Sequence, residues 1–162
     1  MGKLLTYDPR AAEFIIRTEL EELARRIRER LEVTGTNASG KTSRSLRVVT
    51  SDTEGTLFGR KFFQGVETGR AGGRVPRKFR EIILQWMNDK GVHADDGNDG
   101  RMAYLIARKI ARMGTSLYRR GGRNDIYSQE IPRTTESLNK RFSELITTTI
   151  HNIHLNATGV IR

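Results

Sequence analysis

The first part of the chain carries apolar side chains separated by four or three residues, which is the spacing of one face of a helix. This stripe consists of Ile16, Leu20, Leu23, Ile27 and Leu31. Asp8 and Pro9 supply a start signal, because an Asp side chain accepts early backbone N–H groups and a Pro ring fixes a helical φ. Gly35 ends the pattern. The spacing predicts a helix within residues 1–34 that buries only one face.

The helical period returns in three later stretches. Two of them fall within residues 76–114, and Gly91 and Gly114 follow them at the positions of C-terminal caps. The third predicts a C-terminal helix over residues 134–154, after Pro132, with a tail over 155–162. The three apolar sets are Phe79, Ile82, Ile83, Trp86 and Met87; Met102, Leu105, Ile106, Ile110 and Met113; and Leu138, Phe142, Leu145, Ile146, Ile150 and Ile153.

Between the first two helical regions the pattern changes from a helical period to alternation. Residues 45–51 alternate and are rich in Val, and an apolar run resumes after the turn residues 52–55, which predicts a β-hairpin within residues 44–64. Gly69, Gly72 and Gly73 predict a flexible Gly-Arg loop over 65–75, and Gly121-Gly122 an irregular loop over 115–133. The elements together predict one α+β domain, with long amphipathic helices packed on a small antiparallel sheet.

Composition adds a strong positive charge to this picture. The chain has 162 residues, a formal net charge of +10 and a pI near 10.5, which favours contact with nucleic acid, an acidic protein or an anionic membrane surface. It has no cysteine, so a disulfide framework and a thiolate zinc site are excluded, and a reducing compartment such as the cytosol suits it. No stretch approaches the roughly 20 apolar residues that cross a bilayer, and we expect no membrane partner.

One stretch matches a phosphate-binding motif by its letters. The segment GTNASGKT, Gly35 to Thr42, fits G-x-x-x-x-G-K-[ST], which in nucleotide hydrolases lies between a buried strand and a helix. Here a charged amphipathic helix precedes the segment and a strand pattern follows it, so both flanks are wrong. We interpret the match as accidental and nucleotide hydrolysis as disfavoured.

Two further stretches resemble metal sites only in part. DDGNDG, which begins at Asp95, lacks an acidic residue at the third position of a calcium loop and has Ile106 at the twelfth. His151 and His154 lie one helical turn apart, but no Cys or carboxylate cluster completes a site. No serine lies in a nucleophile-elbow pattern. We therefore expect no enzyme activity, no metal and no cofactor.

The basic residues cluster in two glycine-containing loops. Flexible Gly-Arg segments suit phosphates or carboxylates, because long side chains adjust to either. The sequence has no recognition helix, zinc finger or base-stacking motif, so any contact with nucleic acid should be nonspecific. A solvated surface that only maintains solubility is the alternative. The candidate contact residues are Arg60, Lys61, Arg70, Arg74, Arg77 and Lys78, followed by Arg119, Arg120 and Arg123.

Four segments, taken in order, resemble the tail-completion or head-tail connector family of tailed bacteriophages. NASGKTSRSLRV is similar to the family's loop and strand, and FFQGVETGR to its aromatic-x-x-x-Glu-x-Gly segment. IILQWMNDKGV is similar to its helix with Trp and a closing Lys-Gly, and MAYLIARKIARMGT to its Ala-x-x-Ile-Ala-x-Lys-Ile helix. The resemblance covers about residues 36–115, and it places Gly40-Lys41 in a loop before a strand.

The resemblance implies a ring-forming α+β subunit without catalysis. Such a subunit would form a homo-oligomeric ring of twelve or six copies between the portal and neighbouring connector or tail proteins, around the DNA channel. It would lie at the head-tail junction of the virion, and in the host cytoplasm during assembly. The basic loops would face genomic DNA or an acidic neighbouring ring. A nonspecific nucleic-acid-binding protein, favoured by the charge alone, is the alternative.

Overall fold

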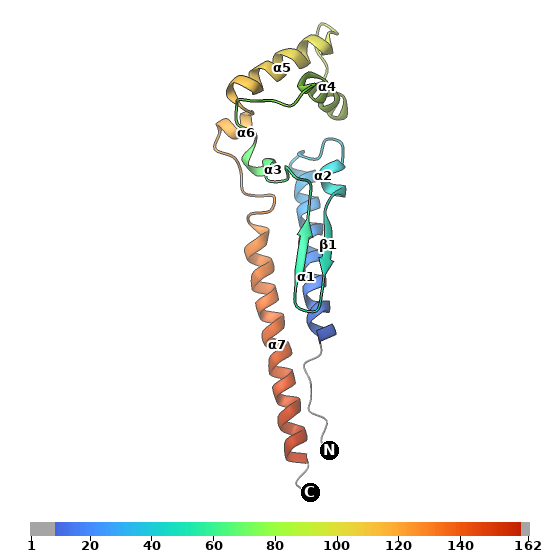
Figure 1. Cartoon of the computed structure of the whole chain (residues 1–162), viewed down its shortest axis with the longest axis vertical. Helices are drawn as coiled ribbons and strands as arrows, with labels where there is room; N and C mark the ends of the chain where they lie inside the picture. Colours follow the sequence, from blue (N-terminus) through green and yellow to red (C-terminus); the bar gives the residue numbers. More distant parts are fainter. Residues whose placement is uncertain (1–8, 160–162) are drawn as a thin grey trace.

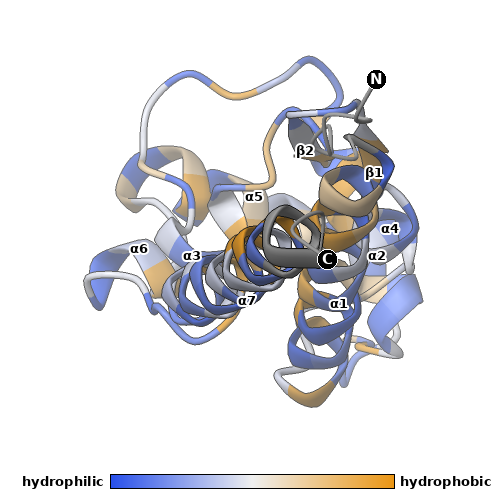
Figure 2. Ribbon diagram, turned by 90° about the horizontal axis from the view of Figure 1, so that it is seen from below, coloured by the Kyte–Doolittle hydropathy of each residue, from blue (hydrophilic) through white to orange (hydrophobic). Residues whose placement is uncertain are grey.

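The computed structural model describes the backbone of residues 9–159 and the side chains of residues 10–154. Two long helices, α1 (Pro9–Val33) and α7 (Glu130–Gly159), pack against each other in opposite directions (Figure 1). A two-stranded antiparallel hairpin, β1 (Arg47–Thr50) and β2 (Gly55–Phe58), lies along α1. We name α1, β1, β2 and α7 the stalk; viewed along its length, the two helices lie side by side (Figure 2).

A helical hairpin stands beyond the end of the stalk at which α1 ends and α7 begins (Figure 1). It consists of α4 (Phe79–Lys90) and α5 (Asp99–Met113). Short helices connect it to the stalk, namely α3 (Gly65–Thr68) before it and α6 (Ser116–Arg119) after it. Another short helix, α2 (Lys41–Arg44), precedes β1. We name residues 70–123 the head.

The β-hairpin packs on α1 through its inward-facing side chains. Val48 pairs with Leu57 in the antiparallel register, and both are partly buried, whereas their neighbours Val49 and Phe58 are exposed. This is the period-2 alternation that the sequence predicted. Gly55 lies so close to α1 that a Cβ there would be 2.3 Å from Ile16, so glycine is required where the hairpin begins its return.

The molecule has two separate hydrophobic clusters, one in each part. In the stalk, α1 contributes Leu23, Ile27 and Leu31, which pack with Leu46 and with Ile126 from the chain that returns from the head. In the head, Ile83 and Met87 of α4 pack on Ala103 and Ala107 of α5, and the two small alanines let the helices approach closely. The fold is therefore the predicted single α+β domain, with its core divided between the two parts.

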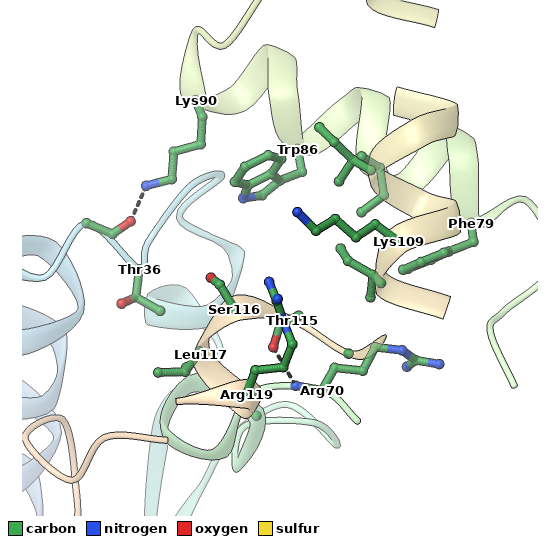
Figure 3. Close-up of a pocket in the computed structure, with 17 residues that line it drawn as sticks. Thr36, Arg70, Phe79, Trp86, Lys90, Lys109, Thr115, Ser116, Leu117 and Arg119 are labelled. Atoms are coloured by element: carbon green, nitrogen blue, oxygen red, sulfur yellow. Dashed lines mark hydrogen bonds between the residues drawn. The ribbon is translucent and has the colours of Figure 1, made fainter. Parts of the chain in front are cut away.

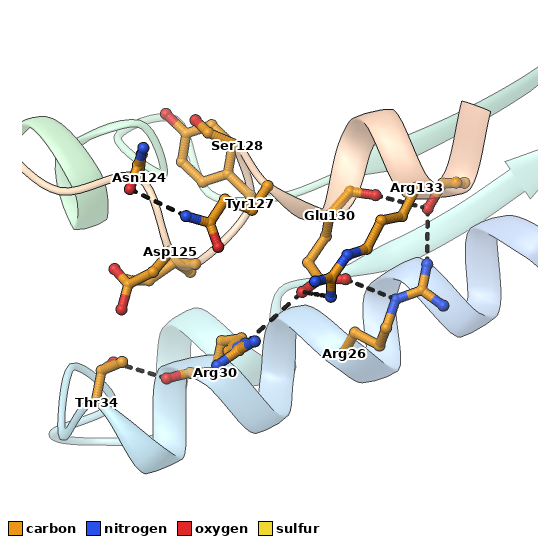
Figure 4. A network of polar contacts seen from close by, with 12 residues as sticks. Arg26, Arg30, Thr34, Asn124, Asp125, Tyr127, Ser128, Glu130 and Arg133 are labelled. Atoms are coloured by element: carbon orange, nitrogen blue, oxygen red, sulfur yellow. Dashed lines mark hydrogen bonds and ion pairs between the residues drawn. The ribbon is translucent and has the colours of Figure 1, made fainter. Parts of the chain in front are cut away.

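Ion pairs connect the two stalk helices across their interface (Figure 4). Glu130, with 1% of its surface exposed, lies 3.0 Å from Nε of Arg26 and 3.7 Å from Nε of Arg30. Further along, the Glu19 carboxylate pairs with Nε of Arg141 at 2.9 Å. Because Glu130 and Glu19 are buried, each carboxylate needs its arginine partners, and the pairs favour this register of α1 against α7.

Several predicted boundaries were wrong. The C-terminal helix begins at Glu130 rather than at 134, because Pro132 falls in its first turn, where a missing N–H removes no helical hydrogen bond. It continues to Gly159, so residues 155–159 of the predicted tail are helical, while 160–162 lie outside the described residues. The predicted loops contain α2, α3 and α6. The N-terminal helix ends at Val33 as expected, and residues 1–8 lie outside the described part.

Candidate interaction surface

The positive charge of the chain is concentrated in the head. Between Arg70 and Arg123 thirteen lysine and arginine residues stand against five carboxylates, so this segment carries eight of the ten net positive charges. The rest of the chain, which includes the stalk, is nearly neutral. Such a separation of charge produces a local positive potential at one end of an elongated molecule.

The first basic loop, which the sequence predicted over residues 65–75, makes specific contacts with α4 and α6 through Arg70. The Arg70 guanidinium lies over the Phe79 ring at 5.4 Å and donates to the carbonyl oxygen of Arg74 at 2.6 Å. The backbone N–H of Thr115 donates to the Arg70 carbonyl at 2.9 Å, and the Arg70 N–H donates to Oγ1 of Thr115 at 3.0 Å. Backbone and side-chain hydrogen bonds therefore attach the loop to Thr115, at the start of α6.

Two glycines allow the basic loop and the start of α6 to lie close together. A Cβ on Gly69 would lie 2.5 Å from the backbone nitrogen of Tyr118, and one on Gly114 would lie 2.6 Å from the Arg70 carbonyl oxygen. Both glycines also have positive φ, at 70° and 77°. At both positions a glycine permits the close approach of two backbone segments.

Seven of the nine predicted contact residues are exposed, and these seven fall into three groups. Arg74, Arg77 and Lys78 are exposed around the start of α4, and Lys78 itself has a φ of 59°, a rare conformation for a residue with a side chain. Arg119 and Arg120 are exposed at the end of α6. Arg60 and Lys61 are exposed but precede α3, outside the head.

Arg123 differs from the other candidates because its charge is paired within the chain. Its guanidinium donates to both carboxylate oxygens of Asp125, at 2.6 and 2.7 Å. The same hydrogen bond lowers the pKa of Asp125 below its ordinary value. Arg123 therefore orders the chain that returns to α7, and it contributes little free charge to the surface.

A second basic surface, on α5, was not among the predicted contact residues. Arg101, Tyr104, Arg108 and Arg112 are all exposed and recur at helical spacing on one side of the helix. The signal was present in the sequence, because the basic positions alternate with the apolar positions that bury the opposite face. It lay outside the glycine-containing loops on which the prediction concentrated.

Glu67 was also missed, and it joins the two chain segments that connect the head to the stalk. It is 2% exposed, and its Oε1 accepts the backbone N–H groups of Ile126, Tyr127 and Ser128 at 2.8, 2.7 and 3.0 Å. Its Oε2 accepts the Ser128 hydroxyl at 2.5 Å. Burial would raise the pKa of Glu67, but these hydrogen bonds outweigh it and hold the pKa below 4.5. The sequence shows only an isolated acidic residue among basic ones.

The motifs that resembled chemical sites have structural roles. The segment from Gly35 to Thr42 runs from α1 to the four-residue helix α2, and no strand precedes it in the described chain, so the phosphate-loop framework is missing. In the DDGNDG stretch, Asn98 caps α5 by accepting the Arg101 N–H at 2.9 Å, and Asp99 accepts the Ala94 N–H at 2.7 Å. Within the described residues, no group of three or more His, Asp or Glu side chains is placed to hold a metal.

Comparisons with protein-family models, with curated proteins and with solved structures give no match to this chain. Among the described helices, none is both long and apolar enough to cross a membrane.

Proposed function

We propose that this chain is a structural subunit of a head-tail connector or tail-completion ring in a tailed bacteriophage, and that the ring joins the portal to the tail around the DNA channel. The observation that carries the proposal is the separation of a strongly basic head from a nearly neutral stalk. A ring of such subunits presents one continuous cationic rim, which suits DNA or an acidic neighbouring ring. The order of the four family-like segments over residues 36–115 supports the same assignment.

The stalk offers the complementary feature, an apolar surface for a neighbouring copy. Ile146, Ile150 and Ile153 of α7 are 56%, 61% and 45% exposed and lie at helical spacing on one face. Copies of this chain repel one another through their heads, but the nearly neutral stalks do not oppose close packing. An exposed apolar stripe on a neutral helix is therefore best covered by another stalk, through the heterologous contact that closes a ring.

Charge reversal in the head tests the proposal. Arg74, Arg77 and Arg80 are exposed, so Arg74→Glu/Arg77→Glu/Arg80→Glu removes surface charge and spares Arg70, whose side chain supports the loop. Lys41→Glu/Arg47→Glu/Lys140→Glu is the control, because it makes the same change in net charge at exposed positions outside the head. We expect the head variant alone to lose ring assembly on the portal or retention of packaged DNA. Normal assembly and DNA retention by both variants would refute the proposal.

Nonspecific nucleic-acid binding by the isolated monomer is the second candidate, favoured by the exposed basic face of α5. Arg101, Arg108 and Arg112 flank the exposed Tyr104 there, an arrangement that suits a phosphate backbone. Fluorescence anisotropy with duplex DNA over a range of salt concentrations distinguishes the two functions. A monomer that binds duplex DNA with a steep salt dependence and never forms rings would favour this second candidate.

A further inference from the structure

A cleft of about 640 Å³ separates the α4–α5 hairpin from the rest of the molecule. One wall consists of α4 and α5, the opposite wall of α6, and the loop that follows α1 closes one end (Figure 3). The Lys90 ammonium group donates to the Gly35 carbonyl oxygen and connects α4 to this loop. The α4–α5 hairpin thus reaches over α6 and the loop after α1 without filling the space between them.

The inner surface of the cleft is mainly apolar. Phe79 and Ile83 from α4, Ile110 from α5 and Leu117 from α6 line it, and the Trp86 indole points into the space. Trp86 is 42% exposed although it belongs to the apolar face of α4. A large aromatic surface left open to water is a favourable binding surface for apolar side chains of another molecule.

The charged residues around this apolar surface are all cationic. Arg70, Lys90, Lys109 and Arg119 line the cleft, and its lining contains no carboxylate among the described residues. Lys109 extends from α5 toward the opposite wall, where Arg119 lies on α6 (Figure 3). A ligand that enters the cleft therefore meets apolar groups at its centre and positive charges on both sides.

From this arrangement we infer that the cleft is a docking groove for a peptide segment of a partner protein in which apolar side chains lie between carboxylates. The apolar lining binds the apolar side chains of the peptide. The long cationic side chains can move to pair with the carboxylates of the peptide. Duplex DNA would use the charges but gain little from the exposed indole, because its bases are already paired and stacked. Any partner protein can supply such a segment, so the groove does not depend on the connector role.

Peptide selection tests this inference and does not require that the partner protein be identified first. A display library of random peptides is selected on the intact wild-type protein, and enriched peptides are synthesised and titrated. Trp86 is the single tryptophan of the chain, so its fluorescence reports directly on the cleft. We expect enriched peptides to combine apolar residues with Asp or Glu, and to shift the Trp86 emission to shorter wavelength in a saturable way.

A matched pair of variants locates the binding. Lys109→Glu/Arg119→Glu reverses two cleft charges, whereas Arg108→Glu/Arg112→Glu reverses two exposed charges that do not line the cleft. Circular dichroism confirms that both variants are folded. We expect the first variant to weaken peptide binding by about tenfold or more, and the second by less than about threefold.

Four results would overturn the inference. The first is a selection that enriches no acidic-apolar peptide, and the second is peptide binding that leaves the Trp86 emission unchanged. The third is an equal loss of peptide affinity in the two variants. The fourth is duplex DNA that displaces the peptide, as seen in the Trp86 emission, and that loses affinity mainly in the Lys109→Glu/Arg119→Glu variant.

Discussion

Glu67 should be the most sensitive single position for the link between the head and the stalk. Its carboxylate accepts the backbone N–H groups of three consecutive residues in the chain that returns to α7, and its own backbone carbonyl accepts the Arg123 N–H at 2.9 Å. Ile126, whose N–H donates one of these hydrogen bonds, is fully buried in the stalk cluster. Glu67→Ala therefore removes the acceptor that holds the head-to-stalk connection in place.

The cost of Glu67→Ala can be estimated from these contacts. The buried Ile126 N–H loses its partner, which costs about 1–3 kcal/mol. Tyr127 and Ser128 are at least partly accessible, so water replaces their contacts and each loses only about 0.5–1 kcal/mol. The expected loss in the free energy of unfolding is therefore about 3 kcal/mol, a large part of the roughly 5–15 kcal/mol typical of a domain. Glu67→Gln keeps one carbonyl oxygen as acceptor and should lose about 1 kcal/mol.

Urea denaturation followed by circular dichroism measures these losses, with Glu136→Ala, an exposed site on α7, as the control. The pKa of Glu67 is lowered in the folded state, so its stabilising contribution is complete above pH 4.5 and is lost as the pH falls through the folded-state pKa. The wild type should thus lose its advantage over Glu67→Gln as the solution is acidified below pH 4.5. A Glu67→Ala protein within about 0.5 kcal/mol of wild type would refute the reasoning.

Three other predictions concern separate parts of the molecule. Gly114→Ala should destabilise the protein by about 2–3 kcal/mol in thermal unfolding, because it combines a strained φ with a clash against a backbone oxygen; Gly97→Ala, which has positive φ but open space, should cost about 1 kcal/mol. Glu130→Ala should cost about 1–2 kcal/mol in urea denaturation, because Arg26 loses one partner but keeps Glu22 and Thr134; an unchanged midpoint would exclude a stabilising network. Isothermal titration should detect no ATP binding by the wild type or by Lys41→Ala, and binding abolished by the substitution would restore the phosphate-loop hypothesis.

The sequence predicted the helices and strands that follow from a local pattern of apolar and polar residues. The stripes of α1, α4 and α5 are long and periodic, and both glycine caps lie where helices α4 and α5 end. The hairpin was predicted equally well, because apolar and polar residues that alternate on both sides of a polar turn are typical of a β-hairpin. The predicted start of α7 was wrong because it follows Pro132, although a proline in the first turn is compatible with a helix.

The features that depend on tertiary contacts were beyond local reasoning. Gly69 looks like a flexible position in the sequence and Gly114 like a helix cap, and only the crossing of two chain segments shows that both are also sites of close packing. The buried role of Glu67 depends on residues about sixty positions away. The cleft combines residues from α4, α5, α6 and the loop after α1, so no single stretch of sequence reveals it.

The most direct test of the proposed function is electron microscopy of the purified protein mixed with the portal protein of the same phage. The proposal predicts a closed ring of this chain on the portal, with neighbouring stalks in contact through the Ile146, Ile150 and Ile153 face and the basic heads on one rim. Particles that stay monomeric, and portals that carry no added density, would contradict it.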